Sequence, residues 1–324
     1  MLDSAGASRR DQLHHMAGPM RRILLWMAGN RFLKAWLPRI WFIRRAARRF
    51  VPGDTVETAL EAAETFRLPH IGVLFTRLGE NLNEMSEAHA VADHYHDLLD
   101  KIRARGLDAE VSVKPTQLGL DLDPEATLQH LAGLATHAAE GRGSVWIDME
   151  GSAYVEQTID LYRRLKETHP NVAICLQAYL RRTPADIHAL LPLKPAIRLV
   201  KGAYDEPASI AFRRKAEVNA AFQSLAVLML PHAERGELRM ALGTHDTDLI
   251  GQIAEYARGA GIPITAFEIQ MLYGIRQDQQ LRLAGEGFRV LSLITYGEAW
   301  YAWYMRRLAE RPANVLFALR QIFS

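Results

Sequence analysis

The chain has 324 residues, of which 49% are hydrophobic and 23% are charged. This is the composition of a globular protein with a sizeable core, in one large domain or two ordinary ones. The single cysteine, Cys175, excludes a framework of disulfide bonds and fits a reducing cytoplasm. Because Cys175 lies in the apolar run VAICL, we expect it to be a small buried hydrophobic residue.

The charge is unevenly distributed along the chain. Residues 1–50 carry eleven Lys or Arg and two Asp, a net charge of +9, so the remainder carries −7 of the total of +2. Trp26, Trp36 and Trp41 are interspersed among the basic residues, a pattern that suits a surface of anionic lipid. No segment has the ~18 uninterrupted apolar residues of a spanning helix, and no signal peptide stands out. Two interpretations stay open: peripheral contact with a membrane, or helices packed on the rest of the protein.

From about residue 54, short apolar runs rich in β-branched residues alternate with stretches of helical periodicity. The predicted strands are 71–76, 110–113, 145–149, 172–177, 197–200, 239–243, 264–270 and 289–294. The predicted helices include 84–105, 123–140, 155–169, 208–234, 248–260 and 277–286. Eight such units in about 250 residues predict a (β/α)8 barrel of the TIM type. We therefore expect a basic, amphipathic helical arm over residues 1–53 and a barrel over residues 54–324.

Polar residues lie in the predicted strands near their ends or just after them, where a barrel of this type places its functional groups. They are Glu80, Lys114, Asp148, Glu150, Gln177, Tyr179, Arg198, Lys201, Thr244, His245, Asp246, Glu268 and Gln270. A final helix carries Arg306 and Arg307 side by side, followed by Glu310. With Lys114, this arginine pair provides three positive charges that can orient a small carboxylate. The pattern predicts a small anionic substrate and no nucleic-acid partner.

Other chemistries remain open on the residues alone. Asp148, Glu150 and His245 could form a metal site, but we prefer to interpret His245 as a hydrogen-bonding loop residue and expect no metal. Lys114 or Lys201 could form a Schiff base if its pKa were lowered, an effect that nearby carboxylates oppose.

Eight motifs follow one another in order along the strand ends. They are LGEN (78–81), SVKPTQLG (112–119), IDMEGS (147–152), LQAYLRRT (176–183), RLVKGAY (198–204), GTHD (243–246), FEIQMLYGIR (267–276) and MRRLAERPAN (305–314). Together they resemble the bacterial, single-function proline dehydrogenases over residues 48–324. The resemblance implies a barrel with non-covalent FAD that oxidises L-proline to Δ1-pyrroline-5-carboxylate in proline catabolism. It also implies that electrons pass to a membrane quinone, and that the protein is cytoplasmic or lies at the inner face of the membrane.

The resemblance further implies a role for each matching residue. Substrate would be bound by the carboxylate ligands Lys114, Arg306 and Arg307, by Glu80 paired with Arg306, and by Leu272 over the ring. Arg198 would lie against the flavin N5, where the hydride arrives, with Asp148 beside the reacting groups. The other flavin contacts would come from Met149, Gln177, Val200, Lys201, Gly202, Ala203, Tyr204, Thr244, His245 and Glu310.

The sequence departs from the family pattern in two places. On the last predicted strand, Leu293 stands where a pocket tyrosine is usual and Thr295 where a proline is usual, and on the final helix Trp303 replaces the tyrosine three residues before Arg306. Hydroxyproline, another substituted proline or another cyclic imino acid therefore remains an alternative substrate. A Schiff-base or metal-dependent lyase, and a flavin-binding relative without turnover, are further alternatives.

Overall fold

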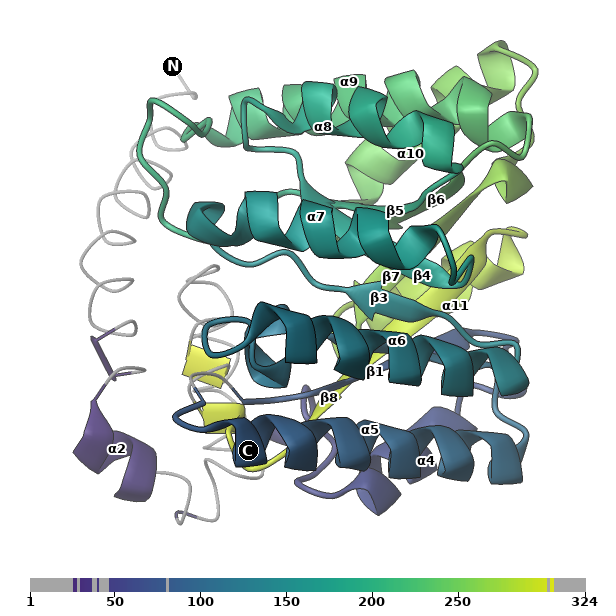
Figure 1. Ribbon diagram of the computed structural model, residues 1–324. Helices are drawn as coiled ribbons and strands as arrows, with labels where there is room; N and C mark the ends of the chain where they lie inside the picture. Colours follow the sequence, from purple (N-terminus) through teal and green to yellow (C-terminus); the bar gives the residue numbers. More distant parts are fainter. Residues whose placement is uncertain are drawn as a thin grey trace, which may run out of the picture.

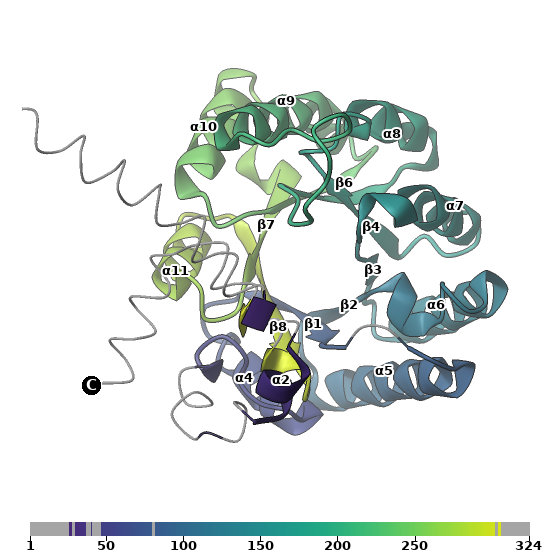
Figure 2. The ribbon, with the colours of Figure 1, turned by 90° about the vertical axis from the view of Figure 1, so that its left-hand side faces the viewer.

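The computed structural model describes residues 26–27, 30–36, 40, 47–79, 82–301 and 304–305. In this part of the chain, eight parallel strands form a closed barrel in chain order, and β8 pairs with β1 to complete the ring (Figures 1 and 2). They are β1 (Gly72–Arg77), β2 (Ala109–Val113), β3 (Val145–Ile147), β4 (Val172–Gln177), β5 (Ala196–Val200), β6 (Arg239–Gly243), β7 (Phe267–Leu272) and β8 (Arg289–Tyr296). The predicted (β/α)8 barrel is confirmed.

Helices surround the strands on the outside of the barrel (Figure 2). They are α4 (Val56–Glu64), α5 (Met85–Arg105), α6 (Pro124–Glu140), α7 (Val155–Lys166), α8 (Thr183–Leu190), α9 (Lys215–Glu234), α10 (Thr247–Gly259) and α11 (Gln277–Gly285). Short 3-10 helices lie at Pro115–Leu118 (η2), Ser152–Tyr154 (η3), Leu191–Leu193 (η4) and Ile264–Ala266 (η5). The arm contributes α2 (Arg31–Trp36), which lies on the side where the strands end (Figure 1).

Local sequence explains these elements. All six residues of β4 are buried, because one face lines the barrel and the other packs beneath the helices. The Asp123 carboxylate caps α6 by accepting a hydrogen bond from the backbone N–H of Ala126 (3.0 Å). Asp246 caps α10 in the same way through the N–H of Leu249 (3.3 Å).

The barrel interior is filled in layers. A small apolar cluster fills the middle, formed by Leu74, Trp146, Ala173, Ala196, Ala241 and Leu291. Toward the amino-terminal ends of the strands, Arg239 forms ion pairs with Glu110 (2.9 Å) and Glu268 (3.1 Å). Paired charges thus fill the bottom of the barrel, and the open end is the one where the strands finish.

Several element boundaries differ from the prediction. The helix predicted from residue 208 begins at Lys215, because the preceding segment pairs with the loop after β4 through a bridge between Leu180 and Ala211. β7 begins at Phe267, after η5, and β3 ends at Ile147. Neither α4 nor α8 was among the predicted helices.

The segment 47–53 packs against the end of β8. The Thr295 hydroxyl donates to the Phe50 carbonyl (3.5 Å), and the Gly297 N–H donates to the Gly53 carbonyl (3.3 Å). A Cβ atom on Gly274 would lie 1.7 Å from the Arg49 carbonyl oxygen, so the chain needs glycine at this approach. Of the helices that the structure describes, none is long and apolar enough to cross a membrane.

Candidate active site

A cavity of about 750 Å³ opens where the strands end, within the size range of small-molecule and cofactor sites. In the described part of the chain, every residue to which the family resemblance assigns a role lines this cavity, whereas the strand-end residues Glu150, Asp246 and Glu268 do not. The lining residues with such a role are Lys114, Asp148, Met149, Gln177, Arg198, Val200, Lys201, Gly202, Ala203, Tyr204, Thr244, His245, Leu272 and Leu293. The five other predicted site residues, Glu80, Trp303, Arg306, Arg307 and Glu310, lie outside the residues that the structure describes.

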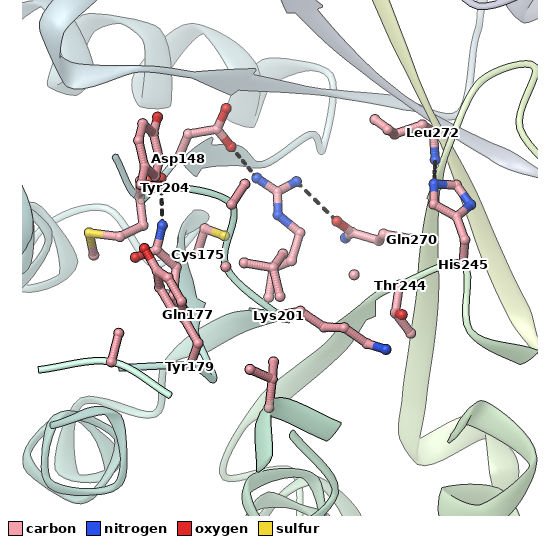
Figure 3. Close-up of a pocket in the computed structure, with 18 of the residues that line it drawn as sticks. Asp148, Cys175, Gln177, Tyr179, Lys201, Tyr204, Thr244, His245, Gln270 and Leu272 are labelled. Carbon is pink, nitrogen blue, oxygen red and sulfur yellow. Dashed lines mark hydrogen bonds and ion pairs between the residues drawn. The ribbon is translucent and has the colours of Figure 1, made fainter. Parts of the chain in front are cut away.

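Arg198 forms a fixed cation at the floor of the cavity. Its guanidinium is 4% exposed and donates to the Gln270 side-chain oxygen (3.1 Å), to the Ser112 hydroxyl (2.9 Å) and to the Asp148 carboxylate. Figure 3 shows Asp148 and Gln270 reaching this group from opposite sides. These bonds come from β2, β7 and the end of β3, so the barrel itself sets the position of the charge.

Lys114 and Asp148 form a second ion pair at the cavity, with 3.0 Å between Nζ and Oδ2. Burial acts to raise the pKa of Asp148, but the charges of Lys114 and Arg198 outweigh it and hold the pKa below its usual value. Burial acts to lower the pKa of Lys114, but the Asp148 carboxylate, with other nearby groups, raises it by a larger amount. The net pKa of Lys114 therefore lies well above the usual value. Asp148 thus lies between two cations, Lys114 and Arg198, and this carboxylate and both cations stay charged at neutral pH.

This electrostatic arrangement bears on the lysine chemistry considered above. A Schiff base requires a neutral amine, whereas Lys114 is held protonated by its carboxylate partner. Lys201 donates to Asn219 (2.7 Å) and forms an ion pair with Asp246 (2.7 Å). The surroundings of both lysines favour charge–charge contact with a ligand over nucleophilic attack.

The loop after β5 forms a wall of the cavity. Gly202 has φ +106, and a Cβ atom there would lie 2.2 Å from Cδ1 of the buried Tyr179 ring. The loop is anchored by Glu206, which accepts hydrogen bonds from the backbone N–H (2.7 Å) and hydroxyl (2.5 Å) of Ser152 in η3. Farther along, the Phe212 N–H donates to the Tyr179 carbonyl (2.8 Å). The wall therefore rests on the loops after β3 and β4.

Gln177 lines the same cavity and contains a buried acceptor. Its amide nitrogen donates to the carbonyl oxygens of Met149 (3.4 Å) and Glu150 (3.2 Å), which fixes the orientation of the amide. Its side-chain oxygen is buried and has no hydrogen-bond partner among the residues that the structure describes. A buried polar atom of this kind indicates a place for a ligand donor.

The metal site considered from the sequence is not assembled by the described residues. The Glu150 carboxylate accepts hydrogen bonds from the backbone N–H (3.1 Å) and hydroxyl (2.8 Å) of Thr116. His245 Nε2 accepts the N–H of Leu272 (3.2 Å), as Figure 3 shows, which fits the hydrogen-bonding interpretation. In the part of the chain described, no group of three or more His, Cys, Asp or Glu residues is placed to hold a metal ion.

The sequence interpretation missed the roles of four residues at this site. Ser112 and Gln270 hold Arg198, Cys175 is buried as expected but also lines the cavity, and Tyr179 packs against Gly202. Three of them have a signal in the sequence, because side chains two residues apart in a strand point the same way. Ser112 precedes Lys114 by two, Cys175 precedes Gln177, and Gln270 precedes Leu272.

A closed barrel with paired charges in a deep cavity at its carboxyl end is the architecture of a (β/α)8-barrel enzyme. Residues 59–320 match the sequence profile of the family Proline dehydrogenase. Proline dehydrogenase 1 of Bacillus subtilis (strain 168) is 38% identical over 303 residues, 94% of this chain and 99% of that protein. The proline dehydrogenase of Deinococcus radiodurans is 35% identical over 279 residues, 85% of this chain and 89% of that protein. The chain belongs to the proline dehydrogenase family.

Solved structures share the fold. Proline utilization A from Bdellovibrio bacteriovorus, inactivated by N-propargylglycine, superposes with a TM-score of 0.75 at 23% identity over 82% of this chain. A second proline utilization A, with proline bound in remote sites, gives a TM-score of 0.67 at 22% identity over 84% of this chain. The aligned region is 32% and 31% of those longer chains, so this protein matches about a third of each.

Proposed function

We propose that the protein oxidises L-proline to Δ1-pyrroline-5-carboxylate with bound FAD, as a step of proline catabolism. The observation that carries this proposal is the buried Arg198 guanidinium, fixed by three side chains at the floor of a large cavity. A fixed positive charge at this place favours a cofactor that gains negative charge on reduction. Family membership supplies the reaction class, and this cation supplies the reason for a flavin.

The residues of the cavity fit a flavin nucleotide. The unpartnered oxygen of Gln177 can accept from a ring N–H, and the cation of Lys201 suits a pyrophosphate. Gly202 leaves a cradle beside Tyr179 in which a ligand can approach the backbone closely. When bound, a flavin would supply the two-electron acceptor for the hydride that leaves Cδ of proline, while the ring nitrogen gives up its proton.

In this proposal each lining residue keeps the role implied by the family motifs. Arg198 and Asp148 lie nearest the reacting atoms, and Arg198 stabilises the reduced cofactor by its charge. The ring is held by Met149, Gln177 and Val200, and the phosphates and ribityl chain by Lys201, Gly202, Ala203 and Tyr204. Thr244 and His245, with Glu310 outside the described residues, hold the nucleotide end.

Substrate binding uses Lys114, the second cation beside Asp148. Lys114 stays protonated and faces the cavity beside Asp148, where it attracts a carboxylate. Arg306 and Arg307, outside the described residues, complete the carboxylate clamp, and Glu80 closes it by pairing with Arg306. Leu272 and Leu293 both line the cavity and supply the apolar wall against the pyrrolidine ring, together with Trp303 outside the described residues.

A substituted proline such as hydroxyproline, or another cyclic imino acid, is the alternative substrate. The specific observation in its favour is Leu293 on the cavity wall, which lacks the hydroxyl of the usual tyrosine. A change of this size in a pocket shifts discrimination by about 1–3 kcal/mol, or tens- to a few hundred-fold. The Leu293→Tyr variant separates the two substrates, because it should raise turnover of proline relative to its analogues.

Electrons would pass on to a membrane quinone, with the arm as the membrane contact. Trp26, Phe32 and Trp36 are 64%, 86% and 68% exposed, in a stretch of net charge +9. Exposed aromatic residues among basic ones suit the interface of an anionic bilayer. The location proposed is therefore the cytoplasm at the inner face of the membrane.

One experiment tests the core of this proposal. The protein is purified, its visible absorbance spectrum is recorded, and any cofactor released by denaturation is identified. The bound flavin is then titrated anaerobically with L-proline, with 4-hydroxy-L-proline and with pipecolate. We expect released FAD and bleaching by L-proline; a protein that neither contains nor binds FAD would overturn the proposal, and FAD that no imino acid reduces would indicate the non-catalytic relative.

A matched pair of variants locates the substrate cation. Lys114→Met removes a charged hydrogen bond to the carboxylate and should weaken proline affinity by roughly 1.5–3 kcal/mol while flavin content stays unchanged. Lys194→Met, on an exposed turn before β5, is the control and should leave affinity unaltered. Equal proline affinity in both variants would remove Lys114 from the site.

A further inference from the structure

Trp146 lies between two arginines in the centre of the barrel. Its ring centroid is 5.2 Å from Cζ of Arg198 and 5.0 Å from Cζ of Arg239, both within cation–π range. Arg239 is level with Ala196, and Arg198 lies two residues farther toward the carboxyl end of the same strand as Ala196. One guanidinium therefore approaches the ring from the active-site end and the other from the closed end.

The barrel is shaped to hold this ring. Trp146 is fully buried, and the apolar cluster around it includes three alanines on neighbouring strands, Ala173, Ala196 and Ala241. Small residues opposite one large one let the indole occupy the barrel axis. The indole N–H donates to the Glu110 carboxylate (2.6 Å), and Glu110 in turn pairs with Arg239 (2.9 Å). The ring is thus fixed both at its edge and across its faces.

The three hydrogen bonds of Arg198 involve only the edges of its planar guanidinium, so they do not fix the two faces of that plane. Asp148, Ser112 and Gln270 hold the edges of the guanidinium, but edge contacts alone allow the plane to tilt or sink. Arg198 borders the cavity, whereas Trp146 is not among the residues that line it. The indole therefore supports the guanidinium from behind, as seen from the cavity.

We propose that Trp146 is a positioning residue that holds the Arg198 charge at the cavity floor and thereby sets the reduction potential of the bound flavin. This inference rests on the proposed flavin function. Without an aromatic face behind it, Arg198 can withdraw into the barrel, away from the cofactor. The reduced flavin then loses part of its electrostatic stabilisation, so the potential becomes more negative and hydride transfer slows.

Two variants isolate the aromatic face. Trp146→Phe and Trp146→Met both remove the indole N–H and both shrink the side chain, but only phenylalanine keeps a π face. Each is compared with wild type for FAD content, midpoint potential by dye equilibration, and rate of flavin reduction at saturating proline. Phe222→Met alters a fully buried aromatic residue on α9 that is not among the residues lining the cavity, and it is the control for general loss of packing.

The variants are expected to differ in midpoint potential and in rate of flavin reduction. Trp146→Phe should keep a potential close to that of wild type, while Trp146→Met should have a more negative potential and reduce about tenfold more slowly, with proline affinity little changed. Phe222→Met should lower the melting temperature without moving the potential. A folded, FAD-loaded Trp146→Met protein with the wild-type potential would overturn the inference.

A measurement on the wild type covers the case in which the methionine variant does not fold. A crystal structure of the FAD-loaded protein should place the Arg198 guanidinium between the Trp146 ring and the flavin. A guanidinium lying off the ring would overturn the inference by itself. Wild-type protein without flavin would instead refute the proposed function, so the two failures are distinguishable.

Discussion

At the scale of single residues, Gly202 shows how closely the loop after β5 approaches its neighbours. Its φ of +106 and the 2.2 Å to the Tyr179 ring leave no room for a side chain. We expect Gly202→Ala to displace the loop and weaken FAD binding by about tenfold or more, because both backbone strain and a steric clash arise. FAD affinity is measured by quenching of flavin fluorescence.

The control for this prediction is Gly236→Ala. Gly236 also has a positive φ, +67, but no atom lies within 4 Å of its added Cβ. It therefore shares the backbone strain, about 1–2 kcal/mol, without the clash. An equal loss of FAD affinity in both variants would show that strain alone, and not the approach to Tyr179, governs the site.

The residue scale also shows what the sequence could and could not reveal. Polar residues at strand ends were predicted to converge on one cavity, and most of those in the described part of the chain do line it. Glu150, Asp246 and Glu268 do not, and Glu268 lies at the opposite end of the barrel, paired with Arg239. Ser112 and Gln270, which hold Arg198, were not assigned that role, although they share the inward face with Lys114 and Leu272. Trp146 stands in the same relation to Asp148. Which inward residue touches which depends on the shear of the barrel, and one sequence does not determine that.

At the scale of elements, the loop between β5 and α9 depends on Glu206. Its carboxylate accepts two hydrogen bonds from Ser152 and fastens the loop to η3. Glu206→Gln keeps the shape but weakens the acceptor, and we expect bound FAD to dissociate about three- to tenfold faster. The release rate is followed by the rise in flavin fluorescence after dilution.

Asp205→Asn provides the matched control on the same loop. Asp205 pairs with Arg213 (2.8 Å), but the two side chains are 70% and 58% exposed. Exposed pairs contribute little, so this variant should stay within about twofold of the wild-type release rate. If Asp205→Asn accelerates release as much as Glu206→Gln does, the contact with Ser152 is not what retains the loop.

The contact between α5 and β8 should make stability depend on pH. His94 Nε2 lies 2.8 Å from the Tyr296 hydroxyl, and burial, with the charge of Arg77, lowers the pKa of His94 from 6.5 to about 4. Between these two values the unfolded chain binds a proton that the folded chain does not. The free energy of unfolding should therefore fall as the pH decreases from 6.5 to 4.

His94→Gln tests this dependence, because glutamine can bond to Tyr296 but does not titrate. Urea unfolding at pH 7 and pH 5 should show a smaller difference in this variant than in wild type. His188→Gln, on the exposed side of α8, should keep the wild-type difference. An unchanged pH dependence in His94→Gln would assign the effect to other groups.

Element boundaries show where local sequence is insufficient. The stretch after residue 208 has helical periodicity, yet it pairs with the loop after β4 through Leu180 and Ala211. That partner is about thirty residues away, so a contact distant in sequence overrides the local preference. Helix α9 starts only at Lys215, where the Glu217 side chain accepts the N–H of Arg214.

At the scale of the whole molecule, the barrel was predictable because strand and helix patterns alternate through eight units. The division into an arm and a barrel remains a proposal, and the contacts of residues 50–53 with β8 suggest where it lies. We expect deletion of residues 1–43 to leave a folded, FAD-binding barrel. Association of the truncated protein with anionic vesicles should be weaker than that of the full chain.

Vesicle sedimentation at rising salt checks this prediction. Binding of the full chain should decrease with salt, since the charge of exposed basic residues is screened over about 10 Å at 0.1 M. Deletion of residues 1–55 is the comparison, because it also removes the contacts with β8 and the Thr55 cap of α4 and should destabilise the barrel. If the protein lacking residues 1–43 does not fold, the arm packs on the barrel.

The pairing of β1 with β8 has a consequence for the protein while it is being made. β1 ends at Arg77, whereas its partner along one edge, β8, ends only at Tyr296. At synthesis rates of about 5–20 residues per second, roughly 10–40 s pass between the emergence of the two strands from the ribosome. Until β8 is complete, β1 keeps one edge with unpaired backbone groups, so the growing chain stays open to pairing with other nascent chains until its last strand is made.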